Sequence, residues 1–244
     1  MKNLMNGYAL VFCDEFDYNG APDPSKWLCE VGNHKWHNDE LQAYTDRPGN
    51  VIVKDGKLII TALKEQDGQR EYTSTRLNSV DAWQHGIIQV SAKLPKGNGS
   101  WPAIWMLGEN LRDGVGWPLC GEIDIMEHVG KKEDEILFSL HSEKRNHAIG
   151  TERTVVDKVN GMCDDFHEYA IHWTAEFIEF FVDGQSYAKF SVGDDKSAED
   201  WPFNQPFYMI LNIAVGGFLG GPVDENTMPY VMEIDYVRVY QKGE

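Results

Sequence analysis

The sequence predicts an all-β protein, a sandwich of two antiparallel sheets. Short apolar runs alternate with polar residues along most of the chain, and turn residues separate them. Asp-Gly pairs at 55–56 and 183–184 are typical hairpin turns, and the 23 glycines and 10 prolines suit many short strands. The sequence has no long apolar run and no internal repeat, which argues against a membrane span and a solenoid. We expect one catalytic domain over residues 1–244, with its core at about 8–241.

The first half of the chain can be divided into strands by these signals. An opening strand at residues 8–16 ends in acidic residues, and a hairpin at 51–62 turns at the first Asp-Gly pair. Four further strands end or begin at clusters of glycine, proline or charged residues. These are predicted at residues 72–77, 85–94, 100–108 and 121–130.

The second half continues the same pattern, with alternation resuming at 138–141. A segment at 165–182 leads into the second Asp-Gly turn and a further strand at 187–192. Its His167 and His172 are one residue too far apart for an H-E-x-x-H zinc helix, and strand alternation argues against a helix, so we exclude a zinc protease. The remaining predicted strands are a buried one that runs into glycines at 206–221 and a closing one at 232–241.

Residues 121–130 interleave three carboxylates with aliphatic side chains. In an extended strand Glu122 and Asp124 share one face, and the isoleucines share the other. Regular alternation would drive Glu127 into the core, where an unpaired carboxylate is costly. A β-bulge at 125–126 would return Glu127 to the face of the other acids, and bulges are common beside active sites. The simpler alternative is a solvated acidic strand face, but the third acid and the surrounding tryptophans argue against it.

The bulged spacing favours the chemistry of a retaining glycosidase. With the bulge, Glu122 and Glu127 are about four strand positions apart. At about 3.3 Å per position, their Cα atoms lie roughly 13 Å apart. Side chains that lean inward bring the carboxyls near the roughly 5–5.5 Å of retaining enzymes, rather than the roughly 6.5–9.5 Å of inverting ones. One carboxylate then attacks the anomeric carbon, and the other donates a proton to the leaving oxygen. We expect Asp124 to position Glu122 and to help keep Glu127 protonated by like-charge coupling.

This order of acids, with one extra apolar residue before the last, resembles the active-site signature of glycoside hydrolase family 16 in its laminarinase-like branch. The resemblance extends over residues 14–241 and implies the β-jelly roll of that family, a concanavalin A-like sandwich whose concave face forms the substrate cleft. It implies that Glu122 is the nucleophile, Asp124 the assisting acid and Glu127 the general acid/base.

Residues 33–45 are polar with embedded aromatic side chains, as suits a sugar site, because sugars offer hydroxyls and apolar ring faces. The segment resembles the W-G-N-N-E-x-Q-Y-Y-T stretch of the same family, from which His37 and Asp39 depart. It indicates Asn38 as a substrate-binding residue. The other substrate-binding residues that we expect are Arg76, Trp101, Trp105, Trp117, His141 and Asn212.

The roles of several of these residues are implied only by the resemblance. It implies that Arg76 and Trp117 face the cleft and that His141 lies near the acid/base, although a structural role for this histidine is an equal alternative. Trp101 and Trp105 share one strand face. We expect Trp101 to be a sugar platform, whereas Trp105 is left open between platform and core.

A net charge of −17 argues against nucleic acids and sulfated polysaccharides, which require lysine and arginine along their path. A neutral β-glucan polysaccharide or oligosaccharide is compatible with it, although the acidity fits a role in solubility equally well. We expect a monomer with no membrane span and with no cofactor for catalysis. The resemblance does imply a structural Ca²⁺ on the convex side, held at Glu15, Gly56 and Asp235, and an all-oxygen set suits this ion.

The cysteines and the N-terminus say little about the compartment. Cys13, Cys29, Cys120 and Cys163 have no C-x-x-C spacing, so they indicate neither a zinc cluster nor a thioredoxin-type site, and disulfides and reduced thiols both stay open. Residues 1–5 are too short and polar for a signal peptide. An enzyme that degrades polysaccharides is nevertheless expected to be secreted or at the cell surface.

The leading functional hypothesis is a retaining endo-β-glucanase that hydrolyses β-1,3 bonds in laminarin-type glucans. A mixed-linkage β-1,3-1,4-glucanase on the same scaffold is the first alternative, although the extra residue Met126 disfavours it. The second alternative is a noncatalytic β-glucan-binding module. Such modules tend to lose one or both glutamates, and both are present here.

Overall fold

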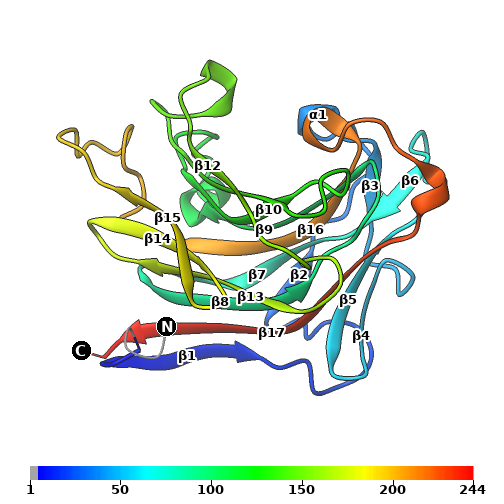
Figure 1. Ribbon diagram of the computed structural model, residues 1–244, viewed down its shortest axis with the longest axis horizontal. Coiled ribbons are helices and arrows are strands. Elements are labelled where there is room, and N and C mark those ends of the chain that lie inside the picture. The colour runs from blue at the N-terminus through cyan, green and yellow to red at the C-terminus, as the bar shows by residue number, and fades with distance from the viewer. Residues whose placement is uncertain (1–4, 244) are drawn as a thin grey trace.

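The computed structural model describes residues 5–243 and consists mainly of two large antiparallel sheets stacked as layers, as predicted (Figure 1). The eight-stranded sheet has the order β15-β14-β13-β8-β17-β5-β4, with β1 also paired to β17. Its strands are β1 (Tyr8–Asp14), β4 (Val51–Lys54), β5 (Lys57–Ala62), β8 (Gly86–Lys93), β13 (His167–Trp173), β14 (Phe177–Val182), β15 (Gln185–Ser191) and β17 (Tyr230–Lys242). Residues 1–4, within the segment considered for a signal peptide, lie outside the described residues.

The seven-stranded sheet carries the three acids and has the order β12-β11-β10-β9-β16-β7-β2. Its central strands β10, β9 and β16 are joined along most of their lengths. Its strands are β2 (Trp27–Cys29), β7 (Arg76–Trp83), β9 (Ser100–Gly108), β10 (Glu122–His128), β11 (Glu135–His141), β12 (Arg153–Lys158) and β16 (Phe207–Val215).

A third, two-stranded sheet was not predicted. Its strands β3 (Gln42–Tyr44) and β6 (Tyr72–Ser74) pair in parallel, and the single strand expected at 72–77 is therefore divided at Thr75. The Thr75 hydroxyl donates to the carbonyl of Thr45 at 2.8 Å, which fixes the point where the chain leaves β6 and enters β7. The helices are single turns, namely η1 (His37–Asp39), η2 (Glu109–Asp113), η3 (His147–Ile149), η4 (Glu225–Thr227) and α1 (Gly217–Gly220).

The core fills the space between the two large sheets. Apolar side chains alternate inward along β5, β7 and β17, and aromatic pairs such as Phe138 with Phe180 and Trp173 with Phe207 connect the layers at centroid distances of 5.5 Å. Strand β16 is buried along its whole length. The outer face of β16 is therefore covered by other parts of the chain and not exposed to solvent. We expect a binding site above the middle of this sheet.

All four cysteines are free thiols, so of the two states left open by the sequence the structure has the reduced one. Cys120 and Cys163 are buried, and Cys13 and Cys29 are partly buried. Within residues 5–243 no helix has the length and apolar character needed to cross a membrane. His167 and His172 lie on the strand β13 and not on a helix, so the exclusion of an H-E-x-x-H zinc helix is confirmed.

Candidate active site

A β-bulge in β10 brings the third acid to the face of the first two. Against β9, Asp124 lies opposite Trp105 and Met126 lies opposite Ile104, so one residue of β10 is left without a partner. Against β11 the register also shifts between Asp124 and Glu127. The isoleucines and Met126 are buried in the core, whereas Glu122 and Glu127 both line the same cavity. The predicted bulge is confirmed, and it follows from the cost of burying a carboxylate between the sheets.

Each glutamate accepts a hydrogen bond from a tryptophan indole. Trp117 Nε1 donates to Oε2 of Glu122 at 2.6 Å, and Trp101 Nε1 donates to Oε1 of Glu127 at 3.0 Å. The two donors come from different elements, since Trp101 is on β9 and Trp117 lies in the loop after η2. The indoles therefore hold the two carboxyl groups apart and in fixed orientations.

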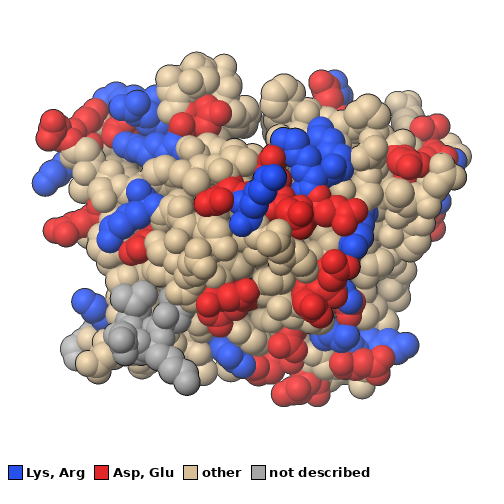
Figure 2. All heavy atoms as spheres, viewed as in Figure 1, with Lys and Arg blue, Asp and Glu red and all other residues tan. Residues whose placement is uncertain are grey.

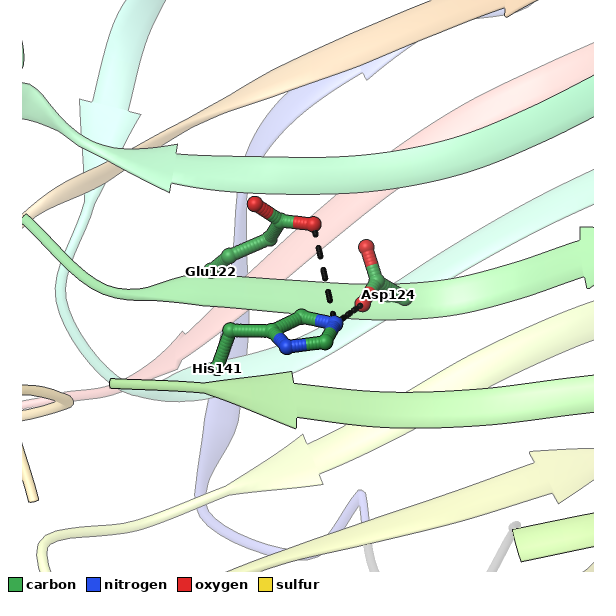
Figure 3. A group of neighbouring side chains, drawn as sticks. All are labelled: Glu122, Asp124 and His141. Carbon is green, nitrogen blue, oxygen red and sulfur yellow. Dashed lines mark ion pairs between the residues drawn. The ribbon is translucent and has the colours of Figure 1, made fainter. Parts of the chain in front are cut away.

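Asp124 is buried between the glutamates and faces a histidine (Figure 3). His141 Nε2 lies 3.3 Å from Oδ2 of Asp124 and 3.9 Å from Oε1 of Glu122. Burial, and then the charges of Glu122 and Glu127, raise the pKa of Asp124 well above its ordinary value. Although burial alone would lower it, the contact with Asp124 and the charges of the three acids raise the pKa of His141 to about 9. The charges of the acids therefore favour a protonated imidazole, which reduces the negative charge of the cluster.

His141 lies near the acid/base, as the resemblance implied: both residues line a smaller cavity next to the main one, and the charge of His141 lowers the pKa of Glu127. The two ion-pair contacts of His141 are with Asp124 and Glu122. The reason is the antiparallel register, in which His141 of β11 lies directly opposite Glu122.

Glu127 has the properties of a proton donor. Burial and the charge of Glu122 raise its pKa to about 7, against the lowering effect of the Trp101 hydrogen bond. The like-charge effect on Glu127 that was expected from Asp124 comes instead from Glu122, whose charge raises the pKa of Glu127. A carboxyl group with a pKa near neutrality is suited to general acid/base catalysis.

The main cavity has a volume of about 630 Å³ and lies over the middle of the seven-stranded sheet. Of the seven substrate-binding residues expected from the sequence, the six other than His141 line it. Trp105, left open between platform and core, is half-buried and belongs to the cavity wall. These six are Asn38, Arg76, Trp101, Trp105, Trp117 and Asn212.

Trp105 and Asn212 are held by a polar relay under one half of this cavity. Trp105 Nε1 donates to Oδ1 of Asn212 at 2.7 Å, and Asn212 Nδ2 donates to the Tyr44 hydroxyl at 3.0 Å. The guanidinium of Arg76 stacks over the Trp105 ring at 4.8 Å and pairs with Glu30 at 2.8 Å. A rigid aromatic and amide surface of this kind is suited to sugar rings, which offer apolar faces and hydroxyls.

Sequence reasoning missed several residues that line the two cavities. Glu40 and Tyr44 were recognised only as part of the 33–45 match, and the structure adds both to the cavity wall. His147, Glu152 and Phe218 lie in segments without regular alternation, so no local signal indicated that they face the acids.

The Glu15 carboxylate, which was expected to bind Ca²⁺, does not fit that role. Both oxygens of Glu15 already accept hydrogen bonds from Arg238, each at 2.7 Å, which satisfies the carboxylate with a guanidinium cation. Gly56 is in a turn, and the Asp235 side chain is exposed. Within the described part of the chain, the grouped metal-ligating side chains are those of Glu122, Asp124 and His141, which belong to the acid cluster.

Comparison with known proteins agrees with this geometry. The family model described as glycosyl hydrolases family 16 matches residues 38–238. The chain is 46% identical over 244 residues to a β-glucanase of Rhodothermus marinus, covering 96% of this chain and 85% of the relative. The structure of a laminarinase from the same organism superimposes with a TM-score of 0.93, covering 97% of this chain and 98% of the other.

A second solved structure is that of SCLam, named as a non-specific endo-β-1,3(4)-glucanase of family GH16. It is 41% identical, with a TM-score of 0.91, and the match covers 97% of this chain and 92% of that one. These matches include strands of both large sheets, since the family model alone spans β3 to β16 and most of β17. From its acids, its fold and these matches, the chain belongs to glycosyl hydrolase family 16.

Proposed function

We propose that the protein is a retaining endo-β-glucanase that hydrolyses β-1,3-glucosidic bonds in laminarin-type glucans. The observation that carries the proposal is the pairing of Glu122 with Glu127 on one cleft, where the second acid has a pKa raised to about 7. The names of the relatives, a β-glucanase and a laminarinase, support glucose polymers as the substrate class.

In the first step the Glu122 carboxylate attacks the anomeric carbon, and the bond from this carbon to the leaving oxygen breaks. Glu127 gives its proton to that oxygen, which leaves as a free sugar hydroxyl. The Trp117 N–H and the His141 imidazole hold the Glu122 carboxylate in the attacking orientation. In the second step Glu127, now ionised, takes a proton from water as its oxygen attacks the anomeric carbon, and Glu122 is released.

Cleavage within the chain is supported by cavities on both sides of the acids. Glu122 and Glu127 line both the main cavity and a second one of about 150 Å³ beside it. A polymer can therefore occupy sites before and after the bond that is cut. A substrate of this size also favours action outside the cell.

The surface charge supports a neutral polymer. On the face shown in Figure 2, lysine and arginine side chains are interspersed with aspartate and glutamate rather than gathered in one area. The net charge of the whole chain is −17. A polyanionic substrate requires a continuous basic path.

Mixed-linkage activity is the second candidate, because the similar protein SCLam is named as a non-specific endo-β-1,3(4)-glucanase. A purely noncatalytic glucan-binding role is disfavoured because Glu122, Asp124 and Glu127 are all present, and burial and the charge of Glu122 raise the pKa of both other acids. A buried cluster of like charges is costly to fold and has no use in a binding module.

The test is product analysis on laminarin, lichenan and barley β-glucan. We expect rapid formation of medium-length oligosaccharides from laminarin, and slower or no attack on mixed-linkage glucans. Glu122→Ala should abolish turnover while leaving oligosaccharide binding intact. The proposal fails if the wild-type protein binds laminarin without releasing reducing ends.

A further inference from the structure

Two groups hold the Glu122 carboxylate, and His147 packs against both of them. The Trp117 N–H donates to Oε2 of Glu122 at 2.6 Å, and His141 Nε2 lies 3.9 Å from Oε1. The His147 ring lies against Trp117 at a centroid distance of 4.9 Å and an angle of 33°, and it meets His141 edge-on at 5.2 Å. These distances are typical of aromatic rings that attract each other. One side chain therefore contacts both partners of the proposed nucleophile.

Trp117 lies in a loop whose backbone alone does not fix the indole. The loop follows η2 and contains two glycines, of which Gly114 has a φ of +93°. Glycine leaves the backbone more freedom than any other residue. The Trp117 ring is only partly buried, so it needs side-chain contacts to keep its N–H directed at Glu122, and His147 supplies one. The other contacts are with a small apolar cluster formed by Leu107, Cys120, Tyr208 and Ile210.

His147 is carried by a loop that is fixed by its own polar contacts. Asn146 is buried, and its Nδ2 donates to the carbonyl of Ser142 at 3.0 Å. Arg145 Nε donates to Oδ1 of the buried Asp200 at 3.1 Å, which connects the loop to the segment before β16. Although the His147 side chain is exposed, the loop therefore holds it in one place beside the cleft.

The His147 ring is uncharged at neutral pH. Burial, and then the charge of His141, lower the pKa of His147, although Glu122 and Glu152 act in the opposite direction. An uncharged ring adds no repulsion beside His141, whose pKa is raised to about 9. The contact of His147 with Trp117 is therefore one of aromatic packing, which another aromatic side chain can supply.

We propose that His147 is a positioning residue for the nucleophile, and that it acts by holding the Trp117 N–H against Oε2 of Glu122. This inference rests on the proposed retaining function, because it concerns the carboxylate that attacks the anomeric carbon. Without His147 the indole turns more freely, and the hydrogen bond to Glu122 is formed in a smaller fraction of the molecules. The attack by Glu122 is then slower, while the binding of the glucan is unchanged.

The direct test is the exchange of the Trp117 indole N–H with water, measured by NMR. Its signal is identified as the one of eight indole signals that Trp117→Phe removes. A hydrogen bond to a carboxylate slows exchange, so His147→Ala should make this N–H exchange at least about threefold faster. His147→Phe, which keeps a ring at this position, should restore most of the protection.

The matched control is His172→Ala. The His172 ring also packs edge-on against two aromatic rings, those of Tyr8 at 5.8 Å and Phe177 at 5.2 Å. It lies on β13 of the eight-stranded sheet, away from the acids. This variant should keep both the exchange rate of the Trp117 N–H and the wild-type kcat.

Kinetics on laminarin measures the consequence for catalysis. His147→Ala should lower kcat and kcat/KM together by roughly 2- to 10-fold, with KM unchanged, since the lost contact acts on the attack and not on sugar binding. In the Trp117→Phe background the same change should have less than about a twofold effect, because no N–H is left to hold. His147→Phe should recover most of the kcat that His147→Ala loses.

Similar thermal midpoints would show that all these variants are folded. The inference is overturned if His147→Ala leaves the exchange of the Trp117 N–H unchanged, or if it lowers kcat equally with and without the Trp117 indole. A rise in KM at constant kcat would also overturn it, because His147 would then be a sugar contact. If the wild type does not cleave laminarin, the proposed function fails instead, and the exchange rates still test the contact between His147 and Trp117.

Discussion

The indole N–H of Trp117 donates to Oε2 of Glu122 at 2.6 Å, from a loop that reaches over the strand carrying the acid. Trp101 makes the equivalent contact with Glu127 at 3.0 Å from the neighbouring strand. The two carboxyls thus have different electrostatic surroundings. The pKa of Glu127 is raised to about 7, while Glu122 faces an N–H donor and an imidazole that stabilise negative charge.

Trp117→Phe should lower kcat by roughly 10- to 150-fold. The change keeps an aromatic ring but removes a hydrogen bond to a charged group, which is worth about 1.5–3 kcal/mol. Steady-state kinetics on laminarin measures it. Trp201→Phe is the control, because the buried Trp201 indole has no hydrogen-bond partner in the described structure; an equal loss in both variants would reject the role given to Trp117.

Trp101→Phe should move the alkaline limb of the kcat/KM profile to higher pH. Glu127 must be protonated to act as the acid, so activity falls as pH rises through its pKa of about 7. The Trp101 hydrogen bond lowers that pKa, and its loss therefore raises it. Trp105→Phe is the control, since its indole bonds Asn212 rather than an acid. A downward shift in the Trp101 variant would contradict this account.

His141→Gln should flatten the dependence of stability on pH between about 6.5 and 9. The folded pKa of His141, about 9, exceeds its ordinary value of 6.5, so its stabilisation is complete below 6.5 and is lost as pH rises through 9. The wild type should lose at most about 3 kcal/mol more than the variant over this range. Urea unfolding at the two ends of the range measures the difference.

The control for His141→Gln is His172→Gln. The pKa of His172 is lowered by burial, so this change cannot remove a loss of stability above pH 6.5. If the two histidine variants behave alike, the raised pKa of His141 is not the cause of the pH dependence.

Arg238→Met should lower the thermal midpoint by roughly 1–4 °C. The Arg238–Glu15 pair is bidentate but partly exposed, and pairs of this kind contribute up to about 1 kcal/mol. Because this guanidinium already satisfies Glu15, EDTA should leave the midpoint of the wild type unchanged. A marked fall on chelation, restored by Ca²⁺, would show that other atoms of the convex face hold the ion.

The sequence predicted the parts of this structure that follow from local rules. The alternation along β10 and the cost of a buried carboxylate sufficed to place Glu122, Asp124 and Glu127 on one face and to predict the bulge. The Asp55-Gly56 turn likewise identified the hairpin of β4 and β5. Both inferences need only neighbouring residues.

The remaining features depend on contacts between distant parts of the chain. The parallel pair β3 and β6 has only three residues in each strand and leaves no periodic signal. The Arg238–Glu15 contact joins residues 223 positions apart. Phe218 was expected in a buried strand at 206–221, but β16 ends at Val215 and Phe218 lies exposed on α1, where it lines the smaller cavity.

The central claim is that the bulge at 125–126 places Glu127 beside Glu122 as the acid partner of a nucleophile. The most direct test is the anomeric configuration of the first-formed product, followed by ¹H NMR during laminarin hydrolysis before mutarotation. A double displacement predicts that the new reducing end appears as the β-anomer and converts slowly to the α-anomer. Initial appearance of the α-anomer would contradict it, because one glutamate would then activate a water molecule for direct attack instead of bonding to the anomeric carbon.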